Sequence, residues 1–124
     1  FYSFNYRGFA VETTEKHRRR GVRCSRLYRL NVSDTVYERI EERIRYFLEN
    51  RENYRYTRLG VLCCVLRLPL YWKNHYFCSQ FVAELLLESK ALRLSRKPCF
   101  YLPNHFIRLL ETQHCLAGME QDII

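Results

Sequence analysis

The stretch YFCSQFVAELLLESK, residues 76–90, holds the most informative pattern in the chain. Its cysteine, Cys78, follows two aromatic residues and precedes a run of residues that favour a helix to about residue 90. Four apolar residues of that run recur at helical spacing and predict a core-facing stripe: Phe81, Val82, Leu85 and Leu86. The stretch therefore places one cysteine at the start of an amphipathic helix.

Upstream, strands are expected at residues 1–4 and 8–12, joined by a turn, because both segments are aromatic and β-branched. A charged loop follows at residues 15–21, and alternation around Tyr28 predicts a third strand to Val32. Ser33 then fits the N-cap of a helix that ends near Asn50. The apolar run at residues 61–68 is compatible with either a buried strand or a short helix.

Downstream, the segment SRKPCFYLP reads as a loop or an edge strand, and Asn104 is expected to cap a last short helix. Residues after Gln113 carry no clear pattern. Strands, helix and strands in this order predict an α+β fold without an alternating parallel sheet. The length of 124 residues and a hydrophobic fraction of 48% predict a single domain over residues 1–124.

Charge and cysteine content bear on partners and compartment. The net charge of +8 is concentrated in an arginine-rich N-terminal half, which can attract an anionic partner such as nucleic acid, lipid or an acidic polymer, or can simply form a solvated surface. The adjacent Cys63 and Cys64 sit in an apolar run, typical of buried free thiols, so a reducing, cytoplasmic setting is expected. No secretion signal is visible at the start of these residues, a question that stays open for any segment upstream of Phe1, and we expect no transmembrane segment, because the longest apolar run is too short to span a bilayer.

Cys78 stands where a nucleophilic cysteine is useful. A cysteine reacts as its thiolate, and the unpaired N–H groups and dipole at a helix start favour negative charge there. The same N–H groups can line an oxyanion hole. A cysteine at a helix start is nevertheless often structural, so the position alone leaves both interpretations open.

The motif YFCSQFVAELL, together with KPCFYLPNHF, resembles the circularly permuted papain-like cysteine hydrolases of the NlpC-type superfamily. FYSFNYRGFAVE looks like the strand pair of that family, and RLYRLNVSDTVYERIEERI looks like its strand followed by a helix. The resemblance implies a papain-like fold, with an antiparallel sheet packed against the helix that carries Cys78. It also implies hydrolysis of a peptide, amide or acyl-ester substrate through an acyl-enzyme.

In the permuted order a base histidine precedes the cysteine, and a polar orienting residue lies on the next strand. The resemblance makes Glu12 the orienting residue, although an ordinary solvent-facing strand end is an equal alternative. It places the histidine just before the strand at residues 1–4, so we expect the base upstream of Phe1, and little activity without it.

The four histidines of the chain are weaker candidates for the base. His17 precedes Cys78 but lies among arginines in a predicted loop, and His75 is close to Cys78 in sequence, which favours a place on the rim of the site. His105 and His114 follow the cysteine, where the permuted order places no base.

No CxxC pair, HxxxH pair or glycine-rich phosphate loop occurs, so we expect no metal and no cofactor. The leading hypothesis is a cysteine hydrolase of amide or ester bonds. Two alternatives stay open: an inactive binding module on the same fold, which a missing base would explain, and a basic nucleic-acid-binding domain.

Overall fold

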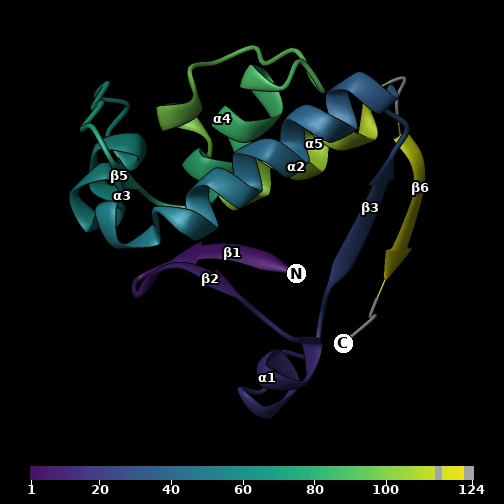
Figure 1. Ribbon diagram of the computed structural model, residues 1–124, viewed down its shortest axis with the longest axis horizontal. Coiled ribbons are helices and arrows are strands. Elements are labelled where there is room, and N and C mark those ends of the chain that lie inside the picture. The colour runs from purple at the N-terminus through teal and green to yellow at the C-terminus, as the bar shows by residue number, and fades with distance from the viewer. Residues whose placement is uncertain (114–115, 122–124) are drawn as a thin grey trace.

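The computed structural model describes residues 1–113 and 116–121, which form a mixture of helices and strands (Figure 1). The helices are α1 (Thr14–Arg19), α2 (Asp34–Glu49), α3 (Arg58–Val65), α4 (Cys78–Glu88) and α5 (Pro103–Glu111), with 3₁₀ turns η1 (Arg51–Asn53) and η2 (Pro98–Phe100). The strands are β1 (Tyr2–Asn5), β2 (Gly8–Val11), β3 (Arg26–Leu30), β4 (Arg55–Tyr56), β5 (His75–Tyr76) and β6 (Leu116–Gln121). The content agrees with the predicted α+β class.

Strands β1 and β2 form the expected hairpin. They pair antiparallel, with Asn5 opposite Gly8 across the turn. Gly8 has φ of +97°, a conformation that L side chains rarely adopt, so glycine suits this position. The turn recognised in the sequence is thus the one that the chain makes.

The described strands form three separate pairs, where the sequence predicted one antiparallel sheet. β3 pairs antiparallel with β6, a strand that the sequence pattern did not reveal. β4 pairs parallel with β5, and α3 lies between them in sequence, because parallel neighbours need a crossover connection. Figure 1 shows the β3–β6 ribbon at the opposite end of the molecule from α3 and β5.

Helix starts follow local capping chemistry. Ser33 caps α2 as predicted, its hydroxyl accepting the N–H of Val36 at 3.3 Å. The ambiguous run at residues 61–68 is mainly helical, because Thr57 caps α3 by accepting the N–H of Gly60 at 3.0 Å. The predicted loop at residues 15–21 is wrong over most of its length: Thr13 caps α1, and Glu15 pairs with Arg18 and Arg19 along it.

The start of α5 also differs from expectation. Leu102, and not Asn104, occupies the N-cap position, and Pro103 is the first helical residue. Proline is suited to that position because its missing N–H would be unpaired there anyway. The preceding segment is neither an edge strand nor plain loop throughout, since residues 98–100 form the turn η2.

A cluster of aromatic side chains holds the hairpin to the helices. Its buried members are Phe4, Phe9, Phe47, Tyr54, Tyr76 and Phe81. The ring centroid of Phe81 lies 5.3 Å from that of Phe9 and 4.8 Å from that of Phe47. Such ring pairs add to the burial of apolar area. The cluster therefore joins α4 to both the hairpin and α2.

The predicted apolar stripe of α4 is correct in part. Phe81 is buried, and Leu85 packs against the cluster, while Leu86 is half-buried. Val82 is 41% exposed, so its assignment to the core is wrong. Neighbouring residues on a helix point about 100° apart, so Val82 cannot share the face of Phe81. The two adjacent cysteines, both expected to be buried, differ in exposure: Cys64 is buried and Cys63 is only half-buried.

Candidate functional site at the start of α4

The start of α4 is anchored by Phe77, the residue before Cys78. Phe77 is 1% exposed and packs against Gly60 of α3, where a Cβ atom would lie 3.2 Å from its Cδ1. The side chain of Gln80 turns back, and its Oε1 accepts the N–H of Phe77 at 3.3 Å. The backbone that presents Cys78 is therefore held from both sides.

Cys78 is the first residue of α4, and its side chain is exposed. Phe77 has no side-chain atom that can accept a hydrogen bond, so no cap covers the N–H groups of the first turn. These N–H groups and the helix dipole favour an anion, either a thiolate or the oxygen of a tetrahedral intermediate. The prediction that a helix starts at Cys78 is confirmed, and the exposure of its thiol is an additional finding.

Tyr56 is a neighbour of Cys78 that the sequence did not reveal, and Arg58 in turn lies near Tyr56. Burial, and after it the negative charge of Cys78, raises the pKa of the Tyr56 phenol, while Arg58 acts in the opposite sense. Tyr56 reaches this place because β4 pairs with β5, which sets Tyr56 opposite Tyr76. A phenol that remains protonated can donate a hydrogen bond, and a nearby guanidinium favours negative charge.

Glu12, the predicted orienting residue, is 3% exposed and follows directly after β2. Its Oε2 lies 2.5 Å from Lys16 Nζ, and its Oε1 accepts a hydrogen bond from Asn5 Nδ2 at 3.0 Å. The hydrogen bond to Lys16 lowers the pKa of Glu12, against the opposing effect of burial. Glu12 is therefore a paired carboxylate, and no hydrogen bond joins it to Cys78 within the described residues.

The histidines with described positions have other neighbours. The ring of His17 lies 5.3 Å from that of Phe1, and its Nε2 is buried without a described partner. His75 stacks on Trp72 at 3.6 Å between ring centroids. Its Nδ1 lies 2.9 Å from the Lys73 carbonyl oxygen, which can only accept, so Nδ1 carries the proton and Nε2 is free to accept.

His105 belongs to the start of α5, and His114 lies outside the described residues. Over residues 1–113 and 116–121, no histidine makes a hydrogen bond to the Cys78 thiol. The structure thus brings Tyr56 to Cys78, with Arg58 near Tyr56, and among the described residues it joins no imidazole to the thiol by a hydrogen bond.

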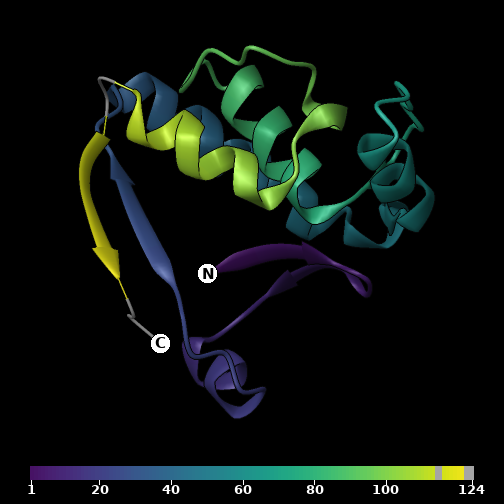
Figure 2. The same cartoon turned by 180° about the vertical axis from the view of Figure 1, so that it is seen from behind.

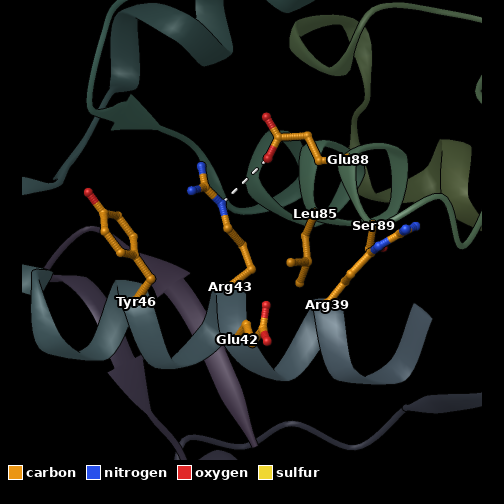
Figure 3. A pocket seen from close by; sticks show the side chains of 7 residues that line it. All are labelled: Arg39, Glu42, Arg43, Tyr46, Leu85, Glu88 and Ser89. Atoms are coloured by element: carbon orange, nitrogen blue, oxygen red, sulfur yellow. Dashed lines mark ion pairs between the residues drawn. The ribbon is translucent and has the colours of Figure 1, made fainter. Parts of the chain in front are cut away.

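A separate cleft of about 290 Å³ lies between α2 and α4, away from Cys78 (Figure 3). Arg43 Nε approaches Glu88 Oε2 at 3.4 Å across it, with Leu85 and Tyr46 nearby. Beneath it, burial and the neighbouring Glu88 raise the pKa of Glu84 to about 7. The ion pair across the cleft bridges the two helices, and we assign no ligand to it.

The described part of the chain contains no group of three or more His, Cys, Asp or Glu side chains placed to hold a metal ion. It also contains no helix with the length and apolar character needed to span a bilayer. The absence of a metal or cofactor site thus stays a prediction from the sequence.

Comparison with known proteins identifies no relative: no protein-family model, curated protein or solved structure matches this chain. The resemblance to permuted papain-like hydrolases therefore rests on sequence motifs alone and stays a prediction.

Proposed function

We propose that this chain carries the nucleophile of a papain-like cysteine hydrolase that cleaves an amide or ester bond. The observation that carries the proposal is the exposed thiol of Cys78 on the first residue of α4, where no side chain of the described residues caps the helix N–H groups. The neighbouring Tyr56 adds a hydrogen-bond donor to the same place, and Arg58 adds positive charge near Tyr56.

The chemistry follows from these groups. The thiolate sulfur attacks the carbonyl carbon of the substrate, a C–S bond forms, and the carbonyl electron pair moves onto oxygen. First-turn N–H groups of α4 and the Tyr56 hydroxyl stabilise that oxyanion. Collapse expels the amine or alcohol, which takes up a proton, and water then attacks the thioester to release the acid and restore the thiol.

Glu12 fits the orienting role through its place beside the N-terminal end of β1. Its N–H donates to the carbonyl oxygen of Phe1 at 2.7 Å. A histidine just before that strand, where the resemblance puts the base, would lie next to the Glu12 carboxylate. The carboxylate would then hold the imidazole in one tautomer, as the third member of a triad does.

Thiol labelling provides the first test, with Cys24 as an exposed cysteine that lies outside any helix. Limiting iodoacetamide at neutral pH, followed by peptide mapping, should modify Cys78 about 2–5-fold faster than Cys24, the range that a helix terminus confers on an anion. Equal or slower labelling of Cys78 would contradict an activated thiol.

Thioester hydrolysis in the presence of added imidazole provides the second readout, because imidazole can act as an external base. We expect a saturable acceleration that Cys78→Ala abolishes, that Tyr56→Phe weakens and that Cys24→Ala leaves unchanged. The same acceleration in Cys78→Ala would show that the reaction does not pass through this residue.

A non-catalytic binding module is the second candidate function. It is favoured by one observation, namely that no histidine of the described residues makes a hydrogen bond to the Cys78 thiol. Reactive labelling of Cys78 without any imidazole-dependent turnover would favour this alternative over hydrolysis.

A further inference from the structure

A second polar region lies at the start of α5, which faces the viewer in Figure 2. A cleft of about 550 Å³ separates the first turns of α5 from the segment at residues 93–96. Its size is within the range of sites that hold small molecules. The side chains that matter for its chemistry are Arg93, Arg96, Arg108, His105 and Tyr101.

Positive charge in this cleft is not balanced by nearby carboxylates. Three arginines line it, and no Asp or Glu does. None of the three forms an ion pair within the described residues, whereas six other basic side chains do. Guanidinium groups present forked N–H donors that match the oxygen atoms of a carboxylate or phosphate. The cleft therefore has the charge of an anion site.

The hydrogen bonds of His105 add a more specific observation. Its Nδ1 accepts the N–H of Leu102 at 3.0 Å, so in the neutral ring the proton is on Nε2. Nε2 lies 3.3 Å from NH1 of Arg96, which is also a donor. The Arg96 N–H is thus aimed at a ring nitrogen that, in this tautomer, carries a proton of its own. An anionic oxygen beside the two nitrogens could accept from both.

Tyr101 provides a third donor. It is 2% exposed, lines the cleft, and its hydroxyl has no hydrogen-bond partner within the described residues. Its ring meets that of His105 edge-on at 6.2 Å between centroids. A buried hydroxyl without a partner is unfavourable, and an anionic oxygen that reached it would satisfy it. The unpaired hydroxyl and the facing donors lie beside the same histidine.

From these observations we propose that the cleft binds a phosphate group. Arg96 and His105 donate to one oxygen, the Tyr101 hydroxyl donates to another, and Arg93 and Arg108 supply the remaining positive charge. These donors come from the loop at residues 93–96, from Tyr101 and from α5. Donors from several directions suit the tetrahedral oxygens of phosphate better than the two oxygens of a planar carboxylate. The site is independent of the proposed hydrolase site, because Cys78 does not line it.

Calorimetric titration with inorganic phosphate, at constant ionic strength set with chloride, tests the proposal. We expect saturable binding that Tyr101→Phe and Arg96→Gln each weaken about tenfold or more, the usual loss for a hydrogen bond to a charged group. Arg45→Gln, which changes an exposed arginine of α2, is the matched control and should alter affinity less than twofold.

Tyr101→Phe keeps the ring and removes only the unpaired hydroxyl, so the unliganded variant should unfold at the same or a higher temperature than the parent chain. A lower unfolding temperature without phosphate would show that the hydroxyl is already paired and would overturn its assigned role. Absence of saturable phosphate binding, or equal losses in Arg45→Gln, would overturn the site as a whole.

Two additional titrations identify the source of the phosphate and separate the two sites. Phenyl phosphate binding more tightly than inorganic phosphate would support the phosphate site and assign it to an organic phosphate monoester. Equal affinities would support it as a site for the free ion. Cys78→Ala should bind phosphate as the parent does, so failure of the hydrolase proposal would leave this one intact.

Discussion

Helix α4 begins after Phe77 and helix α5 begins after Leu102, two apolar residues whose side chains cannot accept a hydrogen bond. In each helix the side chain of the third residue accepts the backbone N–H of the residue before the helix. Gln80 accepts the N–H of Phe77 at 3.3 Å, and His105 accepts the N–H of Leu102 at 3.0 Å. The two starts are thus alike in local hydrogen bonding.

Their surroundings differ. Around the start of α4, Phe77 is held in the interior and the thiol of Cys78 is exposed beside Tyr56. Around the start of α5, arginines and the unpaired hydroxyl of Tyr101 line an open cleft. The comparison shows that one capping arrangement can present either an exposed thiol or an arginine-lined cleft, depending on which distant residues pack against it.

The largest effect is expected from removing Phe81, the ring by which α4 packs into the aromatic cluster. Phe81→Ala should lower the free energy of unfolding by about 3–5 kcal/mol, because the ring is 4% exposed and sits within the aromatic cluster. Val82→Ala, one residue on, should change it by no more than about 0.5 kcal/mol, because Val82 is exposed. Urea denaturation measures both, and similar losses would mean that α4 is rotated from the orientation described.

An effect of intermediate size is expected in the pH dependence of stability, and it comes from Glu84 on α4. The pKa of Glu84 on α4 is raised from 4.5 to about 7 in the folded chain, mainly by burial. The folded state then binds this proton more tightly than the unfolded state, so stability falls as pH rises from about 4.5 to 7. The expected loss is on the order of 1 kcal/mol, since solvent screens the partly exposed group.

Glu84→Gln is neutral at every pH and should flatten the stability profile between pH 5 and 7, whereas Glu38→Gln on the exposed face of α2 should keep the slope. Glu12 contributes in the opposite direction at lower pH, because its pKa is lowered in the folded state. Thermal unfolding across this pH range measures the slope. An unchanged slope in Glu84→Gln would show that Glu84 is ionised in the folded chain at pH 5.

Transferring the capping residue of α4 to α5 should have the smallest effect on stability. Glutamine in place of His105 can accept the N–H of Leu102, so H105Q should change the free energy of unfolding by about 0.5 kcal/mol or less, whereas H105A should cost about 1 kcal/mol. H105A removes the Nε2 donor as well as the cap and should bind phosphate more weakly, whereas H105Q keeps an amide donor and should lose less affinity. Unchanged phosphate affinity in H105A would show that the histidine serves only as a cap.

Several elements were predictable because their signals are local. Ser33 and the helical spacing after it define α2, the turn with Gly8 defines the hairpin, and the run after Cys78 defines α4. The predicted loop at residues 15–21 was wrong, because the prediction considered the charge of the segment and not its capping residue. The charged segment around His17 becomes α1 because Thr13 caps it and Glu15 pairs along it, a combination that composition alone does not reveal.

The candidate site divides in the same way. The place of Cys78 at a helix start was predictable from the residues around it, since helix capping and apolar spacing depend on neighbours in the chain, whereas the exposure of its thiol came from the structure. Tyr56 lies more than twenty positions earlier and reaches Cys78 only through the parallel pairing of β4 with β5. No pattern within residues 54–58 indicates that pairing, so the neighbour could not be identified in advance.

The amino-acid order determined the helices α2 and α4, the first hairpin and the position of Cys78, because each depends on hydrogen bonds and apolar spacing within a few residues. The tertiary structure decided the pairing of β3 with β6, the approach of Tyr56 to the thiol and the meeting of Arg96, His105 and Tyr101. These contacts depend on which surfaces pack together across the whole chain, and that choice is governed by the burial of the shared aromatic core and not by any single segment.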